Sequence, residues 1–153
     1  MKRLAYITAL AAAMTLTTAS CTQNNGHIGP VFGSWSLQSM TVDGTDVPLP
    51  AGAVSATMSF QTDVVRFNLT YEYSHTLESF ATWSKTGDIM TFDFRHHDDV
   101  TAEGTGMYAP PEWLHFEALQ ENATVTELNG KHFDFVRTDD EGHKYIYKFD
   151  RTW

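Results

Sequence analysis

Residues 65–73 read VRFNLTYEY, so that every second side chain is large and apolar and those between are polar. Successive side chains of a β-strand point to opposite faces, and a period of two therefore predicts a strand with one buried face. Two other stretches share this period. They are residues 54–60, with Val54, Ala56, Met58 and Phe60 on one face, and residues 90–94, with Met90, Phe92 and Phe94.

The same period returns near the end of the chain, where Tyr145, Tyr147, Phe149 and Arg151 fall on one face. Less regular strands are predicted at residues 35–42, 77–85, 113–119 and 132–137. Turn-forming residues separate the strands: Asp43-Gly44, Gly87-Asp88, Asn129-Gly130 and residues 139–142. About eight short antiparallel strands without a long helical pattern fit either a barrel or a sandwich.

A short motif at the start of the first strand favours the barrel. Gly33-Ser34-Trp35 resembles the Gly-x-Trp motif that opens lipocalin barrels, in which an Arg of the last strand packs over the Trp. Arg151 stands in the matching place. The stretch WSKTGD at 83–88 and the aromatic last strand are similar to those of small lipocalin-like lipoproteins of Bacteroidetes. Across residues 33–151 this resemblance implies an all-β, antiparallel, up-and-down barrel of about eight strands, lipocalin-like (calycin).

One feature departs from the lipocalin pattern. Lipocalins often carry a Thr-Asp-Tyr motif between their sixth and seventh strands, and residues 119–130 contain no match to it. The resemblance therefore implies the fold, and it does not by itself imply a large, well-closed ligand cup.

The amino terminus has the layout of an export signal. Lys2 and Arg3 precede an apolar, Ala-rich run at residues 4–16, and small residues lead to Cys21. Thr18-Ala19-Ser20-Cys21 resembles the lipobox of bacterial lipoproteins, whose cysteine is lipidated before cleavage. The apolar run is shorter than the roughly 20 residues that cross a bilayer. We expect a lipoprotein signal, with an ordinary secretory signal and a coincidental cysteine as the alternative.

Cys21 is the only cysteine, so the mature monomer has no disulfide or Cys-based metal site. Several acyl chains on one residue give stable anchoring. We expect a signal peptide at residues 1–20, a lipidated cysteine and tether at 21–30, and one barrel domain at 31–153. The expected location is the bacterial cell envelope, at the outer membrane.

Charge excludes one class of partner. Residues 1–20 contain two basic residues and no acidic one, so their removal leaves 8 basic against 19 acidic residues. Such a surface repels nucleic acid. We expect a monomer whose membrane contact is the lipid on Cys21.

Few residues indicate chemistry. The run His96-His97-Asp98-Asp99 offers ligand types that suit zinc or nickel, but consecutive residues of a strand point to opposite faces, so we predict no metal site. The sequence contains no nucleophile elbow and no phosphate-binding loop. We predict no enzyme and no cofactor. The loop at residues 108–113, with two prolines, is either a lid over a barrel mouth or a cap on the core.

The expected function is binding of a small apolar or amphipathic molecule in the barrel, because the strand faces carry more rings than a minimal barrel needs. Arg66 or Arg95 near a rim would select an acidic head group. The alternative is a non-enzymatic module with a filled barrel that presents its loops to a protein or glycan. The candidate ligand-lining residues are Phe67, Leu69, Tyr71, Tyr73, Phe92, Phe94, Tyr145, Tyr147 and Phe149.

Overall fold

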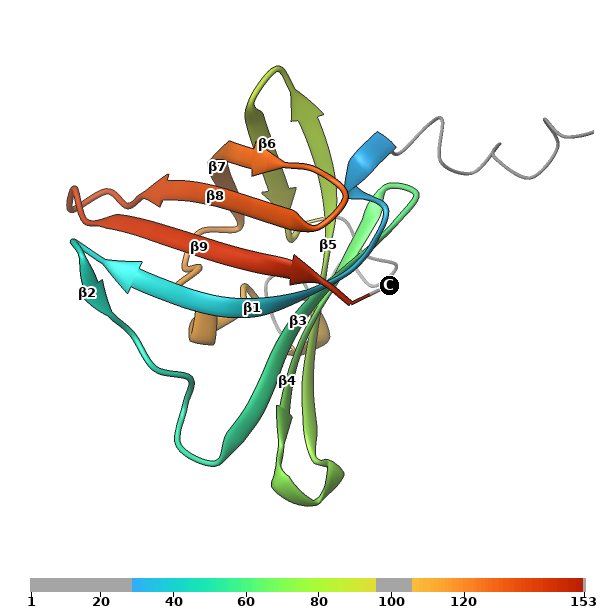
Figure 1. Ribbon diagram of the computed structural model, residues 1–153, viewed down its shortest axis with the longest axis vertical. Coiled ribbons are helices and arrows are strands. Elements are labelled where there is room, and N and C mark those ends of the chain that lie inside the picture. Colours follow the sequence, from blue (N-terminus) through green and yellow to red (C-terminus); the bar gives the residue numbers. More distant parts are fainter. Residues whose placement is uncertain (1–28, 96–105, 153) are drawn as a thin grey trace, which may run out of the picture.

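The computed structural model describes residues 29–95 and 106–152 (Figure 1). The predicted signal, Cys21 and the run at 96–99 lie outside these residues, and what the sequence predicts for them stays a prediction. The strands are β1 (Gly33–Val42), β2 (Thr45–Asp46), β3 (Ala53–Gln61), β4 (Val64–Tyr71), β5 (Thr76–Thr86), β6 (Ile89–Asp93), β7 (Gln120–Leu128), β8 (His132–Thr138) and β9 (Lys144–Arg151).

The sheet closes on itself. From β3 to β9 each strand pairs antiparallel with the next in sequence, β1 pairs with β3, and β9 pairs back with β1 from Trp35↔Arg151 to Val42↔Tyr145. The short strand β2 pairs only with β1 in the described part of the chain. The structure thus confirms a closed, antiparallel barrel of eight strands, with one extra short strand. Closure leaves no long sheet edge exposed to aggregation.

Antiparallel pairing places alternate connections at opposite ends of the barrel. The amino-terminal end holds the start of β1 and the β3–β4, β5–β6 and β7–β8 turns. The other end, called the lid end below, holds the β1–β2, β4–β5 and β8–β9 turns and the long β6–β7 connection. In Figure 1 the chain enters through η1 (Gly29–Val31) at the upper right, and the β4–β5 connection is the lowest point of the barrel.

Two strand predictions are wrong in detail. Residues 113–119 form no strand: the first two belong to a 3-10 turn, η5 (Glu112–Leu114), the rest are irregular, and the seventh strand is β7. The inward residues of β7 are Glu121, Ala123 and Val125, a set too small and polar to produce the expected apolar alternation. Tyr73 also leaves the predicted strand face. It lies in the turn η2 (Glu72–Ser74) at φ 66°, with 97% of its surface exposed.

The barrel interior is filled by side chains. The inward faces of the strands supply the rings that sequence periodicity predicted, and these rings contact one another across the barrel. The largest fully buried side chains are Trp35, Met58, Phe60, Phe67, Leu69, Phe92, Phe94, Phe116, Phe133, Phe135, Tyr147 and Phe149.

Candidate functional site

The amino-terminal half of the interior is filled from the strands. Phe133 of β8 packs against Trp35 of β1, Phe60 of β3 and Phe149 of β9, with ring centroids 5.5 to 6.0 Å apart. Phe60 also meets Trp83 of β5 edge to face. Because strands hold every one of these rings, this half of the barrel is a permanent core.

Trp35 and Arg151 join the first and last strands, as the resemblance implied. The Arg151 guanidinium carbon lies 4.4 Å from the Trp35 ring centroid, and its Nη2 donates to the Pro30 carbonyl at 2.7 Å. The Trp35 indole donates to the Val31 carbonyl at 2.8 Å. Gly33 adopts φ 122°, a conformation that L side chains rarely take, which explains the glycine of the motif. These contacts seal the amino-terminal end.

The lid end is filled differently, by the connection between β6 and β7. Its described part, residues 106–119, is called the lid and contains the turns η4 (Gly106–Tyr108) and η5. Leu114 and Phe116 of the lid are inside the barrel, with 0% and 1% of their surfaces exposed. The Phe116 ring contacts the strand rings Phe67, Phe92, Phe94 and Tyr147, with centroids 5.5 to 6.4 Å apart.

A few hydrogen bonds attach the lid to the strands. The Ser79 hydroxyl of β5 donates to the Ala109 carbonyl, and the Tyr147 hydroxyl donates to the Leu114 carbonyl at 2.6 Å. Burial raises the pKa of Tyr147 far above its ordinary value of 10, so this hydroxyl keeps its proton and remains a donor. Between the two inserted side chains, His115 turns the chain at φ 54°.

A buried ion pair lies beneath the lid. Arg137 of β8 and Glu121 of β7 are 4% and 6% exposed, and Arg137 Nη1 donates to Glu121 Oε2 at 3.3 Å. The other oxygen, Glu121 Oε1, accepts the lid amides of Glu117 at 2.8 Å and Ala118 at 2.9 Å. Arg137 Nη2 donates to the His115 carbonyl. The pair therefore connects two strands and the lid.

Aromatic rings complete the surroundings of Arg137. Its guanidinium carbon lies 4.3 Å from the Tyr145 ring centroid and 5.5 Å from that of Phe116, which is the geometry of cation-π stacking. Its Nε is buried and has no hydrogen-bond partner. An arginine is always charged in proteins, so an unfilled N–H at this depth leaves an electrostatic cost uncompensated.

The rim beside the lid is apolar. Leu77 of β5 pairs directly with Leu69 of β4, so both side chains point to the inner face of the barrel. Leu69 is 1% exposed, whereas Leu77 is 46% exposed. The inward face of the sheet thus continues past the core and meets solvent near Ser79, where the lid is attached.

An ionic clasp holds the lid-end turns together. The His143 Nδ1 contacts Asp43 Oδ2 at 2.7 Å, and Asp43 Oδ1 accepts the Lys144 amide at 2.9 Å. Asp139 accepts the Tyr145 hydroxyl at 3.0 Å. The hydrogen bond with Asp43 raises the pKa of His143, and the Lys144 amide, followed by His143, lowers the pKa of Asp43. The clasp thereby fixes Tyr145 against Arg137.

The structure brings four of the nine predicted lining residues together around Phe116. Phe67, Phe92, Phe94 and Tyr147 surround Phe116, while Leu69 lies near the rim and Phe149 in the amino-terminal half. Tyr145 is buried under Arg137, Tyr71 is half-buried, and Tyr73 lies outside the barrel.

The two arginines proposed for the rim are both on the outside. Arg66 is exposed beside Glu78 at 3.8 Å, and Arg95 pairs with Asp93 at 2.6 Å. Sequence reasoning missed the buried pair instead. The signal for Arg137 was present, because it continues the alternation of Phe133 and Phe135 on the inward face of β8.

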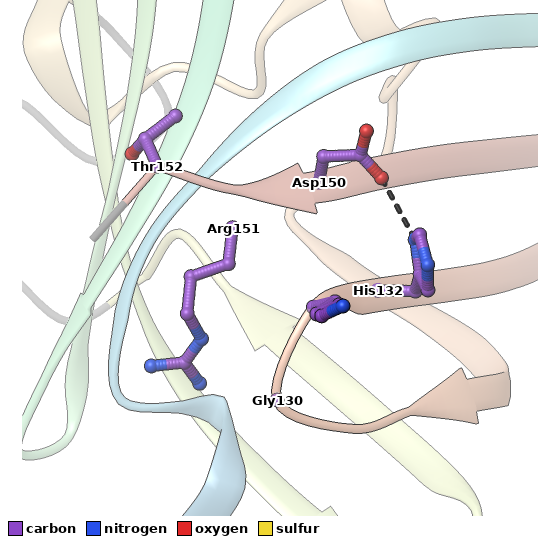
Figure 2. A pocket seen from close by; sticks show the side chains of 6 residues that line it. Gly130, His132, Asp150, Arg151 and Thr152 are labelled. Atoms are coloured by element: carbon purple, nitrogen blue, oxygen red, sulfur yellow. Dashed lines mark hydrogen bonds and ion pairs between the residues drawn. The ribbon is translucent and has the colours of Figure 1, made fainter.

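Pockets open on the surface of the described part of the barrel, and two of them are lined by strand and turn residues. Figure 2 shows one of about 390 Å³ at the amino-terminal end, where His132 and Asp150 pair at 2.8 Å and Arg151 points away from them. The other, of about 360 Å³, is polar and lined by Thr82, Ser84 and Asp93 among others. The first pocket has no ring of the interior in its lining, whereas the second includes Trp83, which packs on Phe60. Within residues 29–95 and 106–152, no three His, Cys, Asp or Glu side chains are placed to hold a metal ion.

The closed barrel, the Trp35–Arg151 contact and the lid define a lipocalin-like fold. A lipocalin-like protein from Bacteroides uniformis matches with a TM-score of 0.54 at 15% identity, over 82% of this chain and 100% of that one. An uncharacterized protein from Bacteroides eggerthii matches with a TM-score of 0.56 at 14% identity, over 76% of this chain and 97% of that one. Such identities establish the fold alone.

Comparisons with protein-family models and with curated proteins give no match. Within the described residues, no helix has the length and apolar character needed to cross a bilayer.

Proposed function

We propose that the chain is a lipid-anchored protein of the bacterial cell envelope whose barrel binds one small apolar or amphipathic molecule at the lid end. The observation that carries this proposal is that a loop, and not the strands, supplies the side chains at the centre of the lid half. In the lid half the central side chains Leu114 and Phe116 come from a loop, which can move without breaking the strand ladder. Ligand exchange then requires a loop displacement and no rearrangement of the barrel.

The expected anchor suits this arrangement. Gly29 follows Cys21 by eight residues, which span at most about 28 Å when fully extended. Lipid on Cys21 would therefore hold the amino-terminal end of the barrel near the outer membrane. The lid end, at the other end of the strands, would be open to the aqueous side. The proposal includes no enzymatic step and treats the protein as a monomer.

The test compares two buried phenylalanines. Phe116→Ala removes a lid ring, and Phe133→Ala removes an equally buried ring from the strand-filled half. The neutral probe N-phenylnaphthylamine is titrated into wild type and both variants, and the protein purified from its native envelope is extracted with solvent for mass spectrometry. We expect about one ligand per protein in the extract and tighter probe binding by Phe116→Ala alone. An empty extract together with flat titrations for wild type and Phe116→Ala would overturn the proposal.

The second candidate is a protein- or glycan-binding module. Its support is the exposed tyrosine at the tip of the β4–β5 connection: Tyr73 is 97% exposed and held at φ 66°, a conformation that is strained for a side-chain-bearing residue. Photo-cross-linking from the neighbouring position Glu72 in intact cells tests this candidate, because Tyr73 then stays in place. A single envelope partner that is captured from position 72 and lost when Tyr73→Ala is added would favour it over ligand binding.

A further inference from the structure

We infer that Arg137 is the receptor for the acidic head group of a single-chain amphipathic ligand, whose tail occupies the space of Leu114 and Phe116. This inference rests on the proposed function and names its ligand class. The place that it assigns is inside the barrel, under the lid, between β8 and the rings that surround Phe116.

The first argument is the unfilled edge of the guanidinium. The Nε–H and one Nη2–H of an arginine are parallel and form an edge that matches the two oxygens of a carboxylate or phosphate. In Arg137 this edge donates to the His115 carbonyl through Nη2, and Nε has no hydrogen-bond partner. Against the effect of burial, the Tyr147 hydroxyl, which also lies close to the guanidinium, raises the pKa of Arg137, but it donates its own proton to the Leu114 carbonyl of the lid. One carbonyl oxygen cannot fill a site shaped for two. An acidic head group satisfies both donors at once.

The second argument is that the ion pair with Glu121 uses the other side of the group. Glu121 receives its bond from Nη1, so a head group at Nε and Nη2 does not require that Glu121 leave. Glu121 also keeps the amides of Glu117 and Ala118 through its other oxygen. These amides fix the carboxyl end of the lid while the segment before them moves, and Glu121 serves as the hinge anchor.

The third argument is the path of the tail. Phe116 touches Phe67 on one wall of the barrel and Arg137 on another, with distances of 5.9 Å between centroids and 5.5 Å to the guanidinium carbon. When Leu114, His115 and Phe116 move out together, the Arg137 edge and an apolar space beside it are uncovered by the same displacement. The exposed Leu77 at the rim provides an apolar entrance.

The experiment uses the mature soluble domain and two forms of one fluorescent probe, cis-parinaric acid and its methyl ester. The forms share their tail and differ in charge. We expect wild type to bind the acid at least about tenfold more tightly than the ester, the factor supplied by a charge-assisted hydrogen bond of ordinary strength. Unlabelled palmitate and lysophosphatidate as competitors distinguish a carboxylate from a phosphate head group.

The variants separate the role of Arg137 from a general effect of charge. Arg137→Met with Glu121→Gln removes both buried charges together, which leaves no unpaired ion, and should bind acid and ester equally. Arg137→Lys keeps the charge but lacks the two-donor edge, so its preference for the acid should fall between the two. Arg66→Met, an exposed control, should keep the full preference.

The outcomes distinguish the two proposals. Equal binding of acid and ester by wild type, or a preference that survives in the Arg137→Met/Glu121→Gln variant, overturns the role of Arg137 and leaves ligand binding in place. Binding of neither probe form by wild type or by Phe116→Ala overturns both. Circular dichroism of each variant confirms that a lost preference occurs in a folded barrel.

Discussion

Replacing Arg137 by Met should destabilise the barrel and loosen the lid. The size of the loss in unfolding free energy follows from the contacts that the substitution removes. The substitution removes the bonds to Glu121 and to the His115 carbonyl and the stacking on Tyr145. Breaking a buried ion pair from one side costs about 3 to 5 kcal/mol, because one charge remains without its partner. Glu121 keeps two backbone donors, so we expect about 3 kcal/mol.

Glu121→Gln should cost about 2 kcal/mol, because the amide nitrogen would face the Arg137 donors. The double variant removes both charges and should lose only about 1 to 2 kcal/mol, so that the coupling energy is roughly 3 to 4 kcal/mol. Urea unfolding at neutral pH, followed by tryptophan fluorescence, measures all four corners of the cycle. Additive losses, with coupling below about 0.5 kcal/mol, would refute the linkage between the pair.

The other predictions concern the two ends of the barrel and the anchor. Arg151→Ala should cost about 1 to 3 kcal/mol in urea unfolding by removing the stacking on Trp35, and a loss below about 0.5 kcal/mol would contradict it. His143→Ala should lower the melting temperature most between about pH 4 and 6.5. The pKa of His143 is raised, so its stabilising contribution is lost as the pH rises through that pKa. The pKa of Asp43 is lowered, so the contribution of this carboxylate is lost only in acid. An equal effect at pH 5 and pH 9 would be inconsistent with the clasp. Cys21→Ser should move the full-length protein from the detergent phase to the aqueous phase in a detergent phase-separation assay. Wild-type protein in the aqueous phase would contradict the lipid anchor.

Sequence periodicity located strands where large rings occupy the inward positions. The predicted strand with Phe67 and Leu69 is β4, and the predicted last strand with Tyr147 and Phe149 is β9. In both strands these side chains point inward, as predicted. The Trp35–Arg151 contact, which joins the first and last strands, followed from a family motif, and the conformation of Gly33 at φ 122° explains the glycine of that motif. A period of two predicts the faces of a strand correctly when one face is buried, because that burial fixes the register of the strand.

The lid and the buried pair could not be predicted in the same way. An inward Glu121 interrupts the apolar alternation of β7, and its partner Arg137 is 16 residues away in another strand. The sequence places Phe116 in a predicted strand because a buried ring of a loop and a buried ring of a strand look alike in sequence. Tyr73 continues the period of two beyond the point where β4 ends. The lid and the buried pair depend on contacts between distant segments, whereas the position of Tyr73 follows from the local turn η2 that ends the strand face.

A filled barrel is compatible with ligand binding when a ligand can take the place of the lid side chains inside it. The free energy needed to expose those side chains then sets a condition on the ligand. Exposing Leu114 and Phe116 costs about 1.5 to 3 kcal/mol each, or about 3 to 6 kcal/mol together. Each methylene of a ligand tail that enters the same space returns about 0.8 kcal/mol, so roughly four to eight methylenes only offset the cost of moving the lid. Short acids would therefore leave the lid closed, and long single-chain acids would gain both the remaining tail burial and the open edge of Arg137. Under the proposed binding mode, selection for long acidic amphiphiles would follow from this exchange, because the loop and the ligand would compete for the same site.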